Sequence, residues 1–179
     1  PTDAIAGETI TPAVTVQVRD AWNNICTNDS STSVDIAVNT GSGSLLGTTT
    51  QTAASGVATF DDLSIEVSDT YDLAATSTGL TGATSSSFVI DPASANYFVI
   101  TGPGTFTAGV SDEITITAYD EFDNIATGYT GDHDLTFSGP NPAPDTTQAT
   151  VEGVTLGTAT SVAFTDGVSD AKAATLTAY

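Results

Sequence analysis

Apolar and polar residues alternate along much of the chain, which is the pattern of half-buried β-strands. In residues 13–19 every second position is apolar, and residues 113–119 repeat this pattern with Ile114, Ile116 and Ala118 on one face. Further segments of the same kind are residues 34–38, 57–60, 70–76, 86–90, 96–101, 134–137, 161–165 and 173–179. Turn residues rich in Gly, Ser and Pro separate them. Short strands at this spacing predict an all-β chain folded as an antiparallel β-sandwich.

An internal repeat predicts two such sandwiches in tandem. The segment DAWNNICT at 20–27 matches DEFDNIAT at 120–127, and the alternating strand before each segment matches as well. The joint between the copies is expected in residues 91–95, which are too few and too stiff for a floppy tether. This places one sandwich at 1–92 and the second at 93–179.

The register of the repeat predicts that each copy lacks some strands. The second copy opens with a strand at 96–101 that has no counterpart in the first, so the first sandwich is expected to lack its first strand. If Gly56 corresponds to Gly167, the second sandwich is expected to lack its last strands. Two explanations stay open: the chain is a window of a longer array, or it is a subunit whose edges are completed by neighbouring subunits through strand addition.

Composition narrows the classes of function. The chain of 179 residues has 22 acidic and two basic residues, a formal charge of −20. Such a chain cannot neutralise phosphates, which excludes nucleic-acid binding, and it has no apolar run of the ~18 residues that a membrane span needs. With 39% hydrophobic and only 13% charged residues it is not an expanded acidic coil. Its 34 Thr and 17 Ser residues favour β-strands whose exposed faces are solvated through hydroxyl groups instead of charged side chains.

The repeated segments resemble a known family. The stretch AYDEFDNIATGYTG at 118–131, with FSGP at 137–140 and SVAFTDGV at 161–168, is similar to tandem bacterial immunoglobulin-like repeats. In the first copy GVATFDDL at 56–63 and YDLAAT at 71–76 are similar to the same invasin- and filamin-type modules of cell-surface or extracellular proteins. The resemblance implies tandem immunoglobulin-like sandwiches that serve as stalks, filaments, lattice units or adhesin spacers.

The acidic loops of the repeat are candidate metal sites. The calcium candidates are Asp20, Asn24, Asp120, Asp123 and Asn124. Oxygen-bearing side chains in a loop can hold Ca²⁺, but the ion wants six to eight ligands and neither loop supplies that many. The alternative is structural, because an Asp that opens a turn accepts hydrogen bonds from the following backbone N–H groups.

The remaining reactive groups have structural alternatives. Asp61 and Asp62 are adjacent and so face opposite ways in a strand, while Asp132 and Asp134 could share one face with His133 on the other. Cys26 matches Ala126 in the second copy, which favours a small buried residue over a reactive thiol.

Two further positions concern the surface of the chain. Trp22 matches Phe122, and we expect both rings to plug a sandwich edge. Asn28 opens an Asn-x-Ser acceptor sequence for N-glycosylation.

These observations favour a non-enzymatic structural module of an extracellular filament, surface lattice or adhesin stalk. Its expected partners are neighbouring immunoglobulin-like repeats or identical subunits bound head-to-tail. No cofactor is indicated other than calcium. The alternative is a ligand- or carbohydrate-binding module of an adhesin or secreted enzyme, which exposed coplanar aromatic rings would favour. The rings in question are those of Tyr97, Tyr119, Tyr129 and Tyr179.

Overall fold

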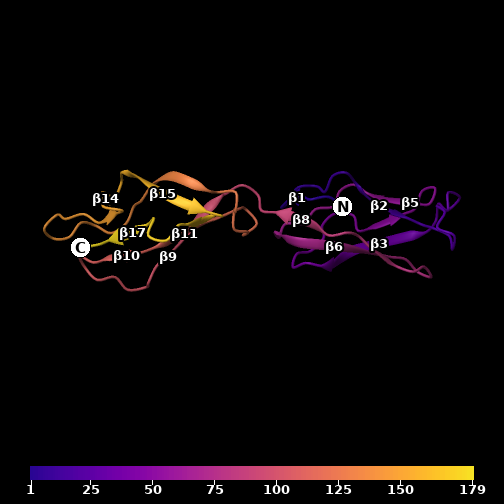
Figure 1. Ribbon diagram of the computed structural model, residues 1–179, viewed down its shortest axis with the longest axis horizontal. Helices are drawn as coiled ribbons and strands as arrows, with labels where there is room; N and C mark the ends of the chain where they lie inside the picture. The colour runs from indigo at the N-terminus through magenta and orange to yellow at the C-terminus, as the bar shows by residue number, and fades with distance from the viewer. The chain divides into compact units, whose positions relative to one another are not determined.

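The computed structural model describes residues 1–179 and consists of strands, turns and loops. The chain divides into two compact units, Pro1–Ala93 (unit 1) and Ser94–Tyr179 (unit 2) (Figure 1). The fold is all-β, and the two units are immunoglobulin-like antiparallel sandwiches in tandem. The structure has no helix of the length and apolarity needed to cross a membrane.

Unit 1 packs a large sheet against a two-stranded one. Its strands are β1 (Ala4–Ile5), β2 (Val14–Gln17), β3 (Ser33–Thr40), β4 (Thr50–Thr52), β5 (Val57–Phe60), β6 (Asp69–Thr76), β7 (Ala83–Thr84) and β8 (Phe88–Asp91). The large sheet has the order β1-β8-β6-β3-β4, with β7 also on β6, and β2 pairs with β5. Figure 1 shows β3 and β6 on one side of the unit and β2 and β5 on the other.

The alternating residues of unit 1 form a closed core between the two sheets. The buried side chains include Val14, Val34, Ile36, Ala58, Phe60, Tyr71, Leu73, Phe88 and Ile90. Tyr71 is the largest of them, and its hydroxyl donates to the Val67 carbonyl at 2.8 Å and accepts from the Gly43 N–H at 2.9 Å. A Cβ at Gly41, where φ is +115°, would lie 2.2 Å from the Tyr71 ring, so the ring requires a glycine there.

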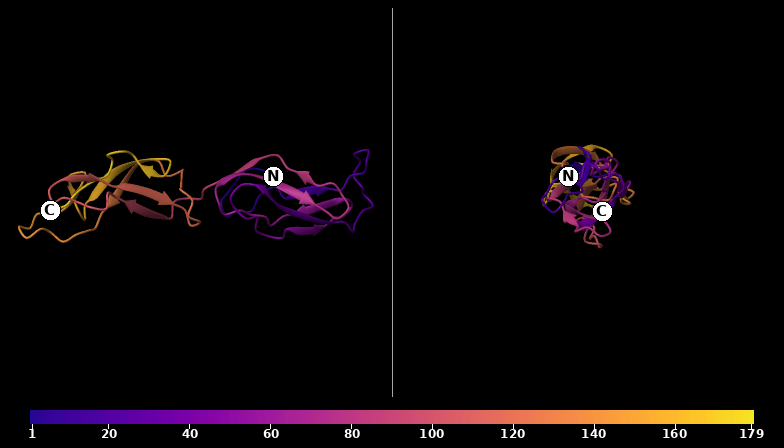
Figure 2. Two further views of the ribbon diagram at one scale, coloured as in Figure 1. Left: turned by 90° about the horizontal axis from the view of Figure 1, so that it is seen from below. Right: turned by 90° about the vertical axis from the view of Figure 1, so that its right-hand side faces the viewer.

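Unit 2 has a five-stranded sheet and a smaller four-stranded one. Its strands are β9 (Tyr97–Thr101), β10 (Ser111–Glu113), β11 (Thr115–Tyr119), β12 (Gly131–Thr136), β13 (Thr150–Val151), β14 (Val154–Thr155), β15 (Ala159–Thr165), β16 (Val168–Ser169) and β17 (Thr175–Thr177). The sheet orders are β12-β15-β16-β11-β9 and β10-β17-β13-β14. The buried core cluster is Ile114, Ile116, Val162, Phe164 and Ala174. The Pro-rich segment 139–145, drawn in orange, lies in a loop that reaches past the strands of this unit (Figure 2).

The two units share strands but differ at their edges. The pairs β2 and β11, β3 and β12, and β5 and β16 occupy equivalent places in the repeat. In unit 2 the edge of β11 is covered by β9, whereas β2 of unit 1 pairs with β5 alone. In unit 1 β3 pairs with both β4 and β6, whereas β12 of unit 2 pairs with β15 alone. Each unit therefore has one strand edge free that the other unit covers.

Candidate functional site

The loop after β2 is organised around the carboxylate of Asp20. Its Oδ1 accepts the backbone N–H groups of Trp22 at 2.9 Å and Asn24 at 2.8 Å, and the Asn24 side-chain amide donates to both carboxylate oxygens. The side-chain amide of Asn24 is the main cause that lowers the pKa of Asp20 below its ordinary value. Asn23 adopts a left-handed φ of +70°, a conformation that Asn tolerates better than most residues.

The loop after β11 repeats this arrangement in unit 2. Oδ1 of Asp120 accepts the backbone N–H groups of Phe122 and Asn124, both at 2.9 Å, and Oδ2 accepts the Asn124 side-chain amide at 2.8 Å. Asp123 has a left-handed φ of +67°, at the position that Asn23 occupies in unit 1. The side chain of Asp120 is fully buried, so its hydrogen bonds replace the water that a buried carboxylate loses.

Each loop is locked to the neighbouring strand by a glycine. In unit 1 the N–H of Val18 donates to the Gly56 carbonyl at 2.8 Å, and in unit 2 the N–H of Ala118 donates to the Gly167 carbonyl at 2.7 Å. A Cβ on Gly56 would lie 2.6 Å from the Cys26 carbonyl oxygen, and a Cβ on Gly167 would lie 2.7 Å from that of Ala126. The same backbone frame is thus built twice.

A tyrosine of β9 covers the acidic loop of unit 2. The Tyr97 hydroxyl donates to Oδ1 of Asp123 at 2.6 Å, and its ring stacks on Tyr119 with centroids 5.5 Å apart. The hydrogen bond to the Asp123 carboxylate is the main cause that raises the pKa of Tyr97 to about 12. Unit 1 has no such strand beside its loop, and Asp20 is only half-buried where Asp120 is buried.

The calcium candidates lie in two separate loops, and the contacts described above already engage their carboxylate oxygens. The carboxylates of Asp20 and Asp120 already accept N–H donors, and that of Asp123 accepts the Tyr97 hydroxyl. Nowhere in the chain do three or more His, Cys, Asp or Glu side chains form a group that could hold a metal ion. The geometry supports a turn-holding role for both loops. Calcium binding there stays a prediction.

The other carboxylate pairs lie in no group that could hold a metal ion. Asp62 accepts the backbone N–H and the hydroxyl of Thr48, the latter at 2.7 Å, and so links two loops of unit 1. Asp132 and Asp134 are exposed on β12, and the ring of His133 between them stacks on Tyr129 with centroids 3.8 Å apart. These contacts are structural.

The remaining candidates from the sequence lie at the surface or near it. Cys26 is half-buried and unpaired, rather than the buried residue that its match to Ala126 predicted. Asn28 is exposed, which leaves its side chain accessible.

The prediction that Trp22 plugs a sandwich edge was wrong. Its side chain is 82% exposed, whereas the matching Phe122 is half-buried. The turn is held in the same way in both loops, through the N–H of residue 22 or 122, but only unit 2 has the strand β9 beside its loop. Of the tyrosines, only Tyr97 and Tyr119 stack on each other; Tyr129 packs on His133 and Phe164, and Tyr179 is exposed.

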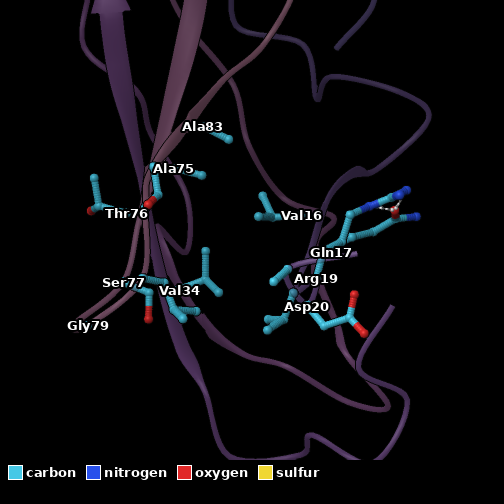
Figure 3. A pocket seen from close by; sticks show the side chains of 14 residues that line it. Val16, Gln17, Arg19, Asp20, Val34, Ala75, Thr76, Ser77, Gly79 and Ala83 are labelled. Carbon is cyan, nitrogen blue, oxygen red and sulfur yellow. Dashed lines mark hydrogen bonds between the residues drawn. The ribbon is translucent and has the colours of Figure 1, made fainter. Parts of the chain in front are cut away.

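Sequence reasoning missed a groove in unit 1. A cleft of about 520 Å³ opens between β2 and the β6–β7 hairpin, with Val16 on one side and Ala75 and Ala83 on the other (Figure 3). We call it the β2 groove. A second hollow of about 380 Å³ extends it along Thr15 and Thr84. The signal in the sequence was the strand at 96–101, which has no partner in the first copy.

Two solved structures are similar to this chain. One is the D0-D1 domain of intimin, with 15% identity, a TM-score of 0.39, and coverage of 99% of this chain and 80% of that one. The other is the adhesin InvE of Yersinia pseudotuberculosis, with 15% identity, a TM-score of 0.39 and coverage of 98% of this chain. The aligned part spans about half of the InvE chain, 48% of it. No protein-family model matches the chain, and no curated protein matches it either.

Proposed function

We propose that the chain is a non-catalytic structural module of an extracellular or cell-surface protein, a spacer built from tandem immunoglobulin-like sandwiches. The observation that carries the proposal is the frame that both units share. What the repeat preserves is an Asp, an Asn and a glycine that fix the backbone, and the carboxylates in it are engaged in holding turns. Such residues serve mechanical integrity rather than chemistry.

The composition supports a place outside the cell. Exposed positions carry Thr, Ser and acidic residues, and the chain has only Arg19 and Lys172 as cationic side chains. A surface of this kind stays solvated. The partners that suit a spacer are adjoining repeats of the same type or further copies of the chain.

Pulling the chain from its two ends in an optical trap tests the spacer role. We expect two separate unfolding steps, each releasing about 300 Å of chain, since each unit has fewer than a hundred residues that extend to ~3.6 Å apiece. A chain that extends smoothly without steps would contradict a load-carrying role.

The second candidate function is a carbohydrate- or ligand-binding module, and the exposed Trp22 favours it. An indole in solvent is a surface on which a sugar ring can stack, and the Tyr97–Tyr119 pair offers a further aromatic face in unit 2. A glycan array probed with the wild-type chain and with Trp22→Ala separates the candidates. Binding that the substitution abolishes would favour the module with a ligand over the spacer.

A further inference from the structure

The outer edge of β2 has backbone groups without a strand partner. β2 pairs antiparallel with β5, with Val14 opposite Phe60 and Gln17 opposite Val57. In such a ladder the N–H and C=O groups of successive residues point to opposite sides. The N–H of Val18 points to Gly56, on the β5 side, so the groups of Thr15 and Gln17 point away from β5. No strand of unit 1 lies on that side.

Unit 2 has a strand at the equivalent edge. β9 runs antiparallel to β11, with Ile100 opposite Ile116 and Phe98 opposite Ala118. The N–H of Asn96 donates to the Tyr119 carbonyl at 2.7 Å, on the side of β11 that corresponds to the free side of β2. The repeat thus has a defined place for a strand here, and unit 2 occupies it.

The side chains of β9 indicate what kind of strand this place takes. Phe98 lies on the inner face, where its ring packs near Phe164 and Tyr129 with centroids 6.1 and 5.5 Å away. Ile100 is two residues further on and shares that face. Tyr97 and Val99 lie on the opposite face. Phe98 and Ile100 pair with the buried Ala118 and Ile116, so these two side chains are the ones that such a strand directs toward the core, although both remain partly exposed.

The β2 groove of unit 1 offers the matching space. Val16 is only half-buried and faces Val34, Ala75 and Ala83, which are small or short apolar side chains (Figure 3). A strand added to β2 would place alternate side chains opposite Val16 and Val18, over this apolar lining. Its backbone would pair with Thr15 and Gln17, which is β-strand addition.

We propose that the β2 groove is an acceptor site for an added β-strand, and that its occupant is an extended polypeptide segment of the β9 type, bound antiparallel to β2 with bulky apolar side chains at alternate positions. The partner is a strand rather than a sugar or a small ligand, because unit 2 places a strand at the same register. The proposal rests on the geometry of unit 1, so it can fail while the spacer role stands.

A peptide with the sequence of residues 95–102 and a soluble polar tail tests the proposal. It is titrated into the ¹⁵N-labelled full chain, and amide signals and their hydrogen exchange are followed. We expect the amides of Thr15 and Gln17 to shift and to become protected from exchange. We expect a peptide with Phe98→Ser and Ile100→Ser to bind at least tenfold more weakly. A peptide with Tyr97→Ser and Val99→Ser should lose much less affinity.

A pair of protein variants checks that the backbone of β2 is the receptor. Thr15→Pro removes an N–H on the free edge, where proline is tolerated, and Thr15→Val keeps it. The peptide should bind the valine variant and lose at least tenfold in affinity for the proline variant. Three outcomes would each overturn the proposal: no shift on β2 at saturating peptide, shifts confined to β11 of unit 2, or equal binding of both serine peptides. None of these outcomes depends on whether Thr15→Pro folds.

Discussion

At the scale of single residues, the glycine at the end of each acidic loop fixes how closely two backbone segments approach. Gly56 has a φ of +79°, and its α-carbon faces the Cys26 carbonyl with no room for a side chain. Gly79, in the same unit, has a φ of +80° and nothing within 4 Å of the place of its Cβ. The two glycines therefore separate the cost of backbone conformation from the cost of a steric clash.

We expect Gly56→Ala to destabilise unit 1 far more than Gly79→Ala. The left-handed conformation alone costs about 1–2 kcal/mol at either position, and the contact with Cys26 adds about 1–3 kcal/mol of overpacking at Gly56. Urea unfolding of both variants, followed by circular dichroism, measures the difference. Equal free energies of unfolding would mean that the loop shifts to admit the methyl group, so that the close approach of Gly56 to Cys26 is not rigidly fixed.

Hydrogen-bonded carboxylates also make stability depend on pH. The pKa of Asp62 is lowered from 3.8, chiefly by the hydrogen bond from the Thr48 hydroxyl, and several other Asp residues are lowered in the same way. A carboxyl whose pKa is lower in the folded state stabilises that state above the unfolded value. The contribution is lost as the pH falls through the folded pKa.

We therefore expect the thermal midpoint to fall below about pH 4 when it is measured in high salt, which suppresses the general repulsion among carboxylates. Asp62→Asn should reduce the acid sensitivity, because the amide does not titrate. Asp61→Asn removes the same charge from the neighbouring position and is the control. The prediction fails if both variants reduce the acid sensitivity equally.

At the scale of elements, β8 divides its residues between the core and the solvent. Phe88 and Ile90 are buried, and Val89 between them is 37% exposed. Together with β6 this strand closes the core of unit 1, and no strand of unit 2 lies beside β12 in the same place. The packing of unit 1 thus depends on inner residues of strands that only this unit has.

Ile90→Ala and Val89→Ala measure that dependence. The first substitution leaves a cavity in the core and is expected to cost about 2–5 kcal/mol. The second removes exposed methyl groups and is expected to cost less than about 1 kcal/mol. Chemical unfolding curves of the two variants give the comparison. A small effect of Ile90→Ala would indicate a core that collapses around the missing side chain.

The sequence predicted the strands that have an apolar face and a polar face. Alternation located β5 closely, since Ala58 and Phe60 face the core and Thr59 faces solvent. It also located β9, although all five residues of that strand are exposed. It joined residues 113–119 into one strand, but the structure ends β10 at Glu113 and begins β11 at Thr115. Ile114, whose N–H donates to the Ala174 carbonyl, is where the chain passes from one sheet to the other. Alternation continues through such a crossing and cannot reveal it.

The candidate site was predictable in part. An Asp and an Asn four residues apart indicated a turn, and both loops have it. The exposure of Trp22 was not predictable, because an indole ring is apolar and the matching Phe122 is half-buried. Six strands were missed because each is only two or three residues long, too short for alternation to show: β1, β4, β7, β13, β14 and β16.

At the scale of the whole molecule, charge is the dominant property. Its 22 acidic residues are countered by only two basic ones, which leaves a formal charge of −20 over 179 residues. Repulsion among these charges opposes folding and weakens as salt screens it. Specific binding of a cation would add to this screening, so the two effects can be separated by the choice of salt.

We expect the thermal midpoint to rise when NaCl is raised from low to moderate concentration. CaCl₂ at matched ionic strength is expected to add little, because the oxygens of Asp20 and Asp120 already accept N–H donors. Differential scanning calorimetry in the two salts makes the comparison. A further rise at micromolar to millimolar Ca²⁺ that Asp120→Asn abolishes would instead identify a calcium site in unit 2.

The exposed indole of Trp22 determines what intrinsic fluorescence can report about this protein. It is the single tryptophan of the chain, and water surrounds it in the folded state as it does in the unfolded state. Its emission should therefore already have the red-shifted maximum of a solvated indole and should barely move on denaturation. Intrinsic fluorescence excited at the tryptophan band would then miss the unfolding of unit 1 entirely, while a ligand that covers this ring would shift the emission to the blue.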